Sequence, residues 1–231
     1  YFLVIDTYPP NKAGSSLLVY EGINAKKTPR QAWSYSTGAR RVRRVPNAGY
    51  DAPLTNSHGM RVADEVDLFN GVADRYNWTS KGKREMYIPY NNIRLKGDLT
   101  SLEGLVHTGH VNPEFLRYEK HRVWVLEAEL KAGMSHIYKK RVYFIDEDTW
   151  SIVYAEEYDE DGKLWQFSES HLINYYDVPV VFSTLENTYD LKDGSYFVEG
   201  IDNDRSSTYD YSKEYSKKQF TTSAVRREAK R

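Results

Sequence analysis

Three histidines have the residue type and part of the spacing that a metal site requires. His107 and His110 are separated by two residues, and His121 could add a third imidazole ligand. Metal-binding motifs usually carry more ligands at closer spacing, and the His107–His110 pair lies in a predicted loop. We therefore expect ordinary loop histidines and predict no metal site.

Glutamates at alternate positions are a second candidate for chemistry. Glu127 and Glu129 lie on one face of a predicted strand, near Lys139 and Arg141 of the next strand. Paired carboxylates can hydrolyse a glycosidic bond, but cross-strand ion pairs explain the same residues with fewer requirements. We favour the ion pairs. A hydrolase would need at least two members of one group to converge in a cleft: Glu127, Glu129, His121, His136 and His171.

Two acidic segments, DEDT at 146–149 and DEDG at 159–162, resemble calcium loops only superficially. A calcium loop needs alternating oxygen ligands and a distant bidentate glutamate, which neither segment supplies. We interpret both as hairpin turns. The chain also lacks a glycine-rich phosphate loop, a nucleophile elbow and a dinucleotide fingerprint. The sequence therefore predicts no catalytic residue and no cofactor.

A basic stretch offers a third candidate. Residues 26–50 contain seven lysines or arginines and no acid, and Trp33 lies among them. Arginines beside aromatic rings can clamp single-stranded nucleic acid, but the net charge of −1 and the lack of a known module argue against it. Arg41, Arg43 and Arg44 would instead contact an anionic head group or a partner protein, or lie on a solvated strand.

Length and composition limit the classes of protein to which the chain can belong. A chain of 231 residues can bury a core, and we expect one β-rich domain over 1–231. The absence of cysteine excludes disulfides and thiolate chemistry. No apolar run approaches the ~18 residues of a membrane-spanning helix, which predicts no transmembrane segment. Because the chain opens on YFLVIDTY without a methionine, we expect a processed or truncated protein.

The segment from Tyr118 to Asp177 must position most of these side chains. It reads as four long strands joined by turns rich in Gly, Asp or Ser, and it predicts an antiparallel meander. In the first strand Trp124 and Leu126 share one face, and Glu127 and Glu129 share the other, which is the period of a β-strand. Nine apolar residues of the meander are our candidates for lining a ligand site or filling a core: Trp124, Leu126, Val142, Phe144, Trp150, Ile152, Tyr154, Trp165 and Phe167.

Other segments are less regular. Further strands are predicted at 1–8, 16–21, 31–37 and 74–92, the last with a turn at 80–82, and a hairpin at 183–201. Apolar residues at helical spacing predict an internal helix over 61–69. Residues 202–231 should be an irregular tail with a terminal helix capped by Thr221 or Thr222. A sheet this large with few helices leaves an apolar trough, or its rings simply fill the core.

Several motifs resemble a known family: GARRVRRVPNAGYD, DLFNGVADRYNW, PYNN, HVNPEFLRYEKHRVWVLEAELK, KRVYFIDEDTW and INYYDVPV. They are similar to exported proteins of Gram-negative bacteria that carry a domain of unknown function, described as outer-membrane lipoprotein-sorting-like. The chain resembles the C-terminal portion of such proteins. The resemblance implies a fold like the carriers LolA and LolB, a curved, incompletely closed antiparallel barrel. It also implies a periplasmic location and envelope or transporter partners, and it assigns no catalytic residue.

These observations favour a periplasmic binding or carrier module for a lipid or another hydrophobic molecule, without catalysis. A structural adaptor that docks to an envelope or transporter protein is the alternative, and a hydrolase is a third possibility. No nucleic-acid partner is expected.

Overall fold

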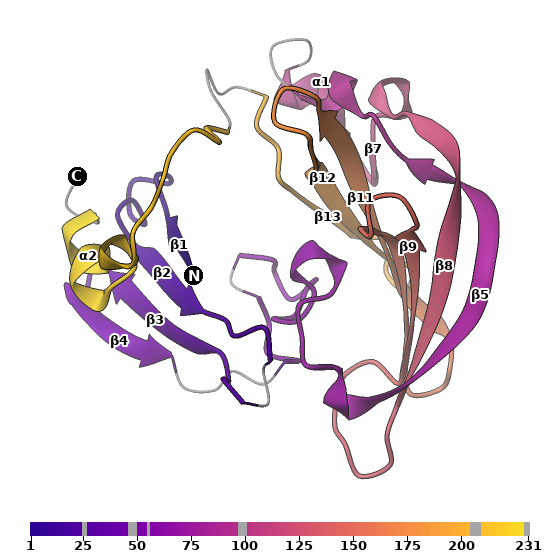
Figure 1. The fold of residues 1–231 in the computed structure, drawn as a ribbon, viewed down its shortest axis with the longest axis horizontal. Helices are drawn as coiled ribbons and strands as arrows, with labels where there is room; N and C mark the ends of the chain where they lie inside the picture. The colour runs from indigo at the N-terminus through magenta and orange to yellow at the C-terminus, as the bar shows by residue number, and fades with distance from the viewer. Residues whose placement is uncertain (25–26, 46–49, 55, 97–100, 204–208, 229–231) are drawn as a thin grey trace. The chain divides into compact units, whose positions relative to one another are not determined.

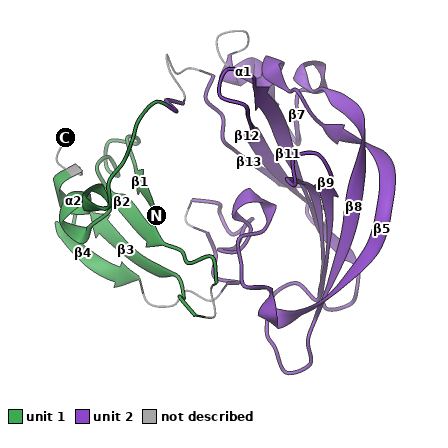
Figure 2. Ribbon diagram, in the orientation of Figure 1, with its two compact units in different colours: residues 1–49, 212–231 green, residues 50–211 purple. Residues whose placement is uncertain are grey.

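Two antiparallel sheets form the framework of the chain in the computed structural model, which describes residues 1–24, 27–45, 50–54, 56–96, 101–203 and 209–228 (Figure 1). The chain divides into two compact units, residues 1–49 with 212–231 and residues 50–211 (Figure 2). Each unit has its own sheet and its own core. The expectation of one domain over 1–231 stays a prediction.

The first unit is a four-stranded sheet with one helix. Its strands lie in the order β1-β2-β3-β4, with bounds β1 Phe2–Ile5, β2 Ser16–Tyr20, β3 Gln31–Ser36 and β4 Arg41–Val45. Helix α2, Thr222–Glu228, packs on one face through Val225, which joins Leu18 and Tyr35 in a core. Thr221 caps this helix, because its Oγ1 accepts the Ala224 N–H at 3.1 Å. The end of the predicted tail, residues 229–231, lies outside the described residues.

The second unit contains a seven-stranded sheet in the order β13-β12-β11-β10-β9-β8-β5. The strands are β5 Tyr76–Pro89, β8 Tyr118–Leu130, β9 Lys140–Asp146, β10 Ile152–Tyr158, β11 Leu164–Tyr175, β12 Val180–Asp190 and β13 Tyr196–Glu199. Figure 1 shows β5 and β8 bending along their length. Among the described residues the edge strands β13 and β5 do not pair with each other, so the sheet does not close into a barrel. The predicted fold class and the meander are confirmed.

Short elements surround this sheet. They are the 3₁₀ turns η1 Val66–Leu68, η2 Ala73–Arg75, η3 Ile93–Leu95 and η5 Pro113–Phe115, helix α1 Leu102–Leu105, and the ribbon of β6 Val106–His107 with β7 His110–Val111. The segment that holds η3, α1, β6 and β7 packs against β12 through Leu95, Leu105 and Leu185. No helix among the described residues is long and apolar enough to cross a membrane.

Two local predictions are wrong. Residues 61–69 are not a helix: only η1 is helical in type, and Asp67 (φ 53°) and Leu68 (φ 63°) adopt left-handed backbone that an α-helix cannot contain. The turn expected at 80–82 is instead a β-bulge within β5, which continues through it as one strand.

Candidate functional site

The two faces of the seven-stranded sheet carry different side chains. Directly paired residues of an antiparallel sheet lie on the same face. Val125 of β8 pairs with Phe144 of β9, and we call their side of the sheet the Phe144 face. Leu126 pairs with Tyr143, which defines the opposite Tyr143 face.

The Phe144 face holds an apolar core, beside a buried polar group of Glu169, His171 and Asn187. Its cluster comprises Ile88, Val123, Val125, Val142, Phe144, Val153, Tyr154 and Leu172. Because the sheet bends, β5 contacts β10 across this face: Tyr154 Oη donates a hydrogen bond to the Tyr87 carbonyl at 3.0 Å. Side chains from strands that are not neighbours in the sheet thus fill this face.

One part of the Tyr143 face is covered by aromatic rings. Trp78 stacks on Tyr143 at 5.9 Å between centroids, and Phe69 meets both rings edge-on at 5.3 and 5.5 Å. Leu68 of η1 is 1% exposed in the same cluster. The covering segment is residues 61–70, which holds little regular structure. We call it segment 61–70.

The nine candidate lining residues do not share one face. Val142, Phe144, Tyr154 and Phe167 lie on the Phe144 face, and Trp124, Leu126 and Ile152 lie on the Tyr143 face. Trp150 is 70% exposed, in a turn at φ 59°. Trp165 stands at a bulge, where its indole N–H donates to Asp190 at 2.7 Å. A bulge between Ile152 and Tyr154 shifts the register, so alternation along β10 does not hold there. Their role as ligand lining stays a prediction.

A buried ionic cluster occupies the rest of the Tyr143 face. Arg141 of β9 is fully buried, and its Nη1 donates to Asp64 Oδ2 of segment 61–70 at 3.0 Å. His136 Nε2 lies 3.2 Å from the same oxygen. Burial opposes ionisation of Asp64, but His136 and Arg141 outweigh it and hold its pKa below the ordinary value. The guanidinium also lies over the rings of Phe69, Tyr138 and Tyr143.

A second arginine attaches the start of the segment. Arg61 Nη1 donates to Glu186 Oε2 of β12 at 3.0 Å and contacts Glu199 of β13. Burial raises the pKa of Glu186 to about 7, although Arg61 opposes the rise. Glu186 is therefore partly protonated near neutral pH.

Two further glutamates lie between these pairs. Glu65 Oε1 is 3.0 Å from Tyr138 Oη, which is itself 2.6 Å from Gln166 Oε1. Glu157 of β10, 1% exposed, pairs in register with Arg141 and Gln166. Burial and then the neighbouring Glu65 raise the pKa of Glu157 well above its ordinary value.

Several polar atoms of this cluster are buried without a hydrogen-bond partner among the described residues. They are Arg61 Nε and Nη2, Asp64 Oδ1, His136 Nε2, Arg141 Nε and Nη2, Tyr143 Oη and Glu157 Oε2. Buried polar groups are usually paired. The cluster therefore has unused capacity to bind a polar ligand or protons.

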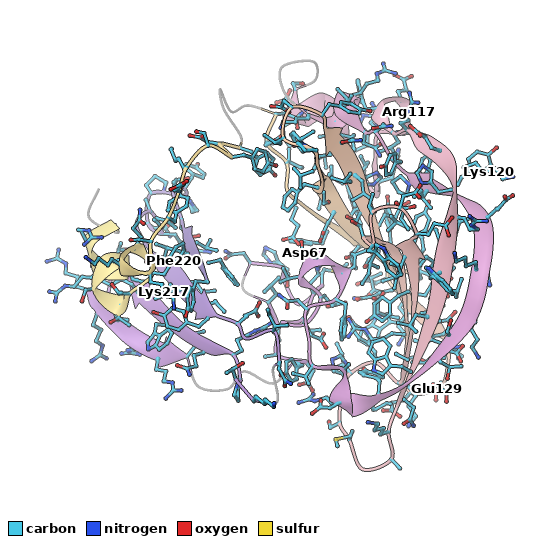
Figure 3. All side chains as sticks on the ribbon, viewed as in Figure 1. Asp67, Arg117, Lys120, Glu129, Lys217 and Phe220 are labelled. Carbon is cyan, nitrogen blue, oxygen red and sulfur yellow. The ribbon has the colours of Figure 1, made fainter. Side chains whose placement is uncertain are left out.

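The hydrolase group does not converge. Glu127 lies 2.8 Å from Lys81, and Glu129 is exposed at the end of β8 (Figure 3). His136 Nε2 lies 3.2 Å from Asp64 on the Tyr143 face. His171 Nε2 lies 2.8 Å from Asn187 Oδ1 on the opposite side of the sheet. The predicted ion-pair partners of Glu127 and Glu129 were wrong. Arg141 lies on the Tyr143 face and pairs with Asp64, and Lys139 lies 3.7 Å from Glu160.

The two loop histidines, and His121 from the hydrolase group, make close contacts elsewhere. The rings of His107 and His110 lie 5.5 Å apart in the β6–β7 ribbon. His121 instead joins Asp146 and Asp148, with ligand atoms within 4.8 Å of one another. Both Asp146 oxygens are in use, since one contacts His121 at 2.9 Å and the other accepts from Thr149. The side chain of Asp146 thus caps the turn at 146–149 and holds His121, which accounts for this group without a metal ion.

The three arginines of the basic stretch lie in the first unit. All are exposed on β4, with Arg44 paired to Trp33 on the face that bears α2, and Arg41 and Arg43 on the opposite face. None forms an ion pair within the described part of the chain. Contact with a head group or partner stays a prediction.

The ionic cluster was missed from the sequence. Its members come from segment 61–70, the β8–β9 connection and the five strands β9 to β13, so no local spacing links them. One local signal existed. An added Cβ on Gly71 would lie 2.9 Å from Asp64 Cβ, so only glycine permits this close approach of the backbone to Asp64.

Comparisons with known proteins agree with the sequence motifs. A family model described as "Protein of unknown function (DUF1329)" matches residues 1–226. The uncharacterized protein PA3922 of Pseudomonas aeruginosa is 43% identical over 231 residues, which are 100% of this chain and 51% of that protein. The chain thus spans about half the length of this curated relative.

Two crystal structures share the fold. A domain of Vibrio parahaemolyticus assigned to outer membrane lipoprotein sorting aligns with a TM-score of 0.59 at 14% identity, over 97% of this chain and 76% of that chain. A DUF1329 family protein of Desulfovibrio piger aligns with a TM-score of 0.56 at 17% identity, over 96% and 75%. At these identities the likeness concerns the fold alone.

Proposed function

The chain belongs to the family described as Protein of unknown function (DUF1329), and on that premise we propose that it is a periplasmic binding or carrier module for a lipid or another hydrophobic molecule, without catalysis. The membership confirms the resemblance found in the sequence. The fold shared with a domain assigned to outer membrane lipoprotein sorting supports a carrier by analogy of fold alone.

One observation carries the proposal: the apolar part of the Tyr143 face is covered by segment 61–70 rather than by a regular element. Leu68 and Phe69 occupy this surface, against Trp78 and Tyr143. An acyl chain could take the place of these two side chains when the segment moves away, because both are held there by non-directional apolar contact. Aromatic and aliphatic walls of this kind are typical of sites for hydrophobic ligands.

Native mass spectrometry of the freshly purified chain, followed by organic extraction, tests the proposal. A bound mass that leaves on denaturation and extracts as a lipid supports it. If no such mass is found and added fatty acids and phospholipids also fail to bind, the carrier function is wrong.

A brominated fatty acid then locates the site, because bromine quenches only nearby tryptophans. We expect quenching to lose most of its amplitude in Trp78→Phe and to persist in the control Trp150→Phe, whose ring is exposed in a turn. Quenching that survives in Trp78→Phe would place the ligand elsewhere.

The adaptor remains a second candidate because of one patch in the first unit. Phe2, Val4 and Leu17 are 39%, 49% and 36% exposed and share one face of the β1–β2 pair, opposite α2. Exposed apolar groups on a sheet face are typical of protein docking surfaces. A Val4→Glu substitution that abolished capture of an envelope partner and left lipid binding intact would favour the adaptor.

A further inference from the structure

The ionic cluster beneath segment 61–70 has more buried carboxyl groups than buried guanidinium groups. The carboxyl groups are Asp64, Glu65, Glu157 and Glu186, and the guanidinium groups are Arg61 and Arg141. An uncompensated ion in a protein interior costs several kcal/mol. The excess negative charge must therefore be neutralised within the cluster.

His136 does not supply the missing positive charge. Its Nδ1 accepts the Tyr138 backbone N–H at 3.1 Å, so this nitrogen carries no proton. The ring proton lies on Nε2, facing Asp64 at 3.2 Å. An imidazole that accepts a hydrogen bond at one nitrogen carries a single ring proton and is neutral.

The ion pairs account for two of the four carboxyl groups. Asp64 is paired with Arg141, and Glu186 with Arg61. Glu65 and Glu157 have no ion pair within the described part of the chain. These two are left to bind protons.

The contacts of Glu65 support a proton on its carboxyl group. Its Oε2 accepts the Val62 backbone N–H, and its Oε1 lies 3.0 Å from Tyr138 Oη. Tyr138 Oη also lies 2.6 Å from Gln166 Oε1, yet a hydroxyl has only one proton to donate. A proton on Glu65 Oε1 satisfies both contacts, because Glu65 then donates to Tyr138 and Tyr138 donates to Gln166.

We propose that Glu65 and Glu157 form a proton-binding site that couples the attachment of segment 61–70 to protonation of the cluster. When the segment leaves the sheet, water reaches both carboxyl groups and they release their protons. Rising pH therefore loosens the segment. The inference concerns protons alone and stands apart from the carrier function, since it requires no hydrophobic ligand.

The surroundings favour this behaviour. Burial raises the pKa of Glu65, although Arg141 opposes it, and burial raises the pKa of Glu157 further. The other titratable or charged groups that face the pair, from every element packed against it, are Arg61, Asp64, Asp67, Tyr76, His136, Tyr138, Arg141, Tyr143, Glu186 and Glu199. A carboxyl group whose pKa is raised in the folded state stabilises that state below its ordinary value, near 4.5, and this contribution is lost as pH rises through the folded value.

Hydrogen exchange of the full chain between about pH 5 and about pH 8 tests the coupling. After correction for the intrinsic exchange rate, protection of segment 61–70 should fall about tenfold per pH unit for each linked proton. Glu157→Gln mimics the protonated carboxyl group, so the slope of protection against pH should correspond to about one linked proton fewer than in the wild type. The control Glu129→Gln, on an exposed carboxyl group at the end of β8, should leave it unchanged (Figure 3).

Infrared spectroscopy of the same proteins reads the protons directly. The wild-type chain near neutral pH should show the carbonyl stretch of a protonated carboxyl group, and this band should weaken in Glu65→Gln and in Glu157→Gln. Absence of the band in the wild type decides against the proposal even if a variant fails to fold, whereas its assignment to Glu65 and Glu157 depends on the variants, because Glu186 also carries a proton in this pH range. Absence of the band in the wild type, or protection of segment 61–70 that does not fall as pH rises, would overturn the proposal.

Discussion

The two faces of the seven-stranded sheet bury side chains in different ways. The Phe144 face is closed by the bend of the sheet, which brings Ile88 of β5 and Leu172 of β11 into one apolar cluster. The Tyr143 face is closed by segment 61–70, which Arg61 and Asp64 attach through ionic contacts. Apolar packing is non-directional and independent of pH. Ionic contacts fix one arrangement and depend on protonation.

This difference assigns the stability of the unit to one face and the attachment of segment 61–70 to the other. A buried ion pair adds little net stability over an apolar replacement, but removing one partner is costly because the other charge stays buried. The Phe144 face therefore stabilises the unit, whereas the Tyr143 face determines when its cover is in place. The variants below test this division, from the largest expected effect to the smallest.

The largest effect should come from Arg141→Met. The substitution leaves Asp64 buried without its guanidinium, and we expect a loss of about 3–5 kcal/mol in the free energy of unfolding, measured by urea denaturation. The matched control Arg122→Met removes an exposed arginine that pairs with Glu147, and it should change stability far less. Adding Asp64→Asn to Arg141→Met should recover part of the loss. An equally small loss in both arginine variants would show that Asp64 reaches water easily.

Leu172→Ala should remove comparable stability without any dependence on pH. Leu172 is 2% exposed on the Phe144 face, and truncating a buried leucine costs about 2–5 kcal/mol. Urea denaturation at two pH values should give the same loss, while the loss in Arg141→Met should vary between them. Leu164→Ala, at an exposed leucine of the same strand, is the control. A loss in Leu172→Ala that changed with pH would break the contrast between the faces.

The meander could be predicted because its signals are local. Alternation over 118–130 and the DEDT and DEDG turns fix the strands and their order, since consecutive strands joined by tight turns pair with each other. The faces could not be fully predicted. A single extra residue near Val153 moves Ile152 and Tyr154 to opposite sides, and nothing in the local pattern marks that bulge.

Segment 61–70 failed as a prediction for a different reason. Val62, Val66 and Phe69 have helical spacing, but the charged residues between them are buried and bind partners far along the chain. Periodicity assumes that charged side chains face water. Arg61 and Asp64 break that assumption because Glu186 and Arg141 supply their partners, so the backbone follows these contacts rather than the apolar pattern.

One buried histidine beside the apolar core of the Phe144 face should respond to pH with the sign opposite to that of the Tyr143 face. His171 is fully buried beyond the Phe144 face, and burial lowers its pKa below 6.5. A base with a lowered pKa stabilises the folded state above its ordinary value, and this contribution is lost as pH falls through 6.5 toward the folded value. Thermal unfolding should therefore show less destabilisation on acidification in His171→Gln than in wild type. The same variant should leave the loosening of segment 61–70 at high pH unchanged. Loss of that high-pH response in His171→Gln would show that the faces are coupled.

The smallest effect should come from an ion pair as short as the buried one. Lys81 Nζ lies 2.8 Å from Glu127 Oε1, while Arg141 Nη1 lies 3.0 Å from Asp64 Oδ2. Lys81 is 46% exposed, so water solvates its charge whether or not the pair forms, and salt screens the attraction. We expect Lys81→Ala to change unfolding by little more than the error of the measurement, and by less still at high salt. Two pairs of similar length would then differ in strength because of their burial, which is the property that distinguishes the two ways this sheet is covered. A large, salt-resistant loss in Lys81→Ala would mean that distance, rather than burial, sets the strength of ion pairs on this sheet.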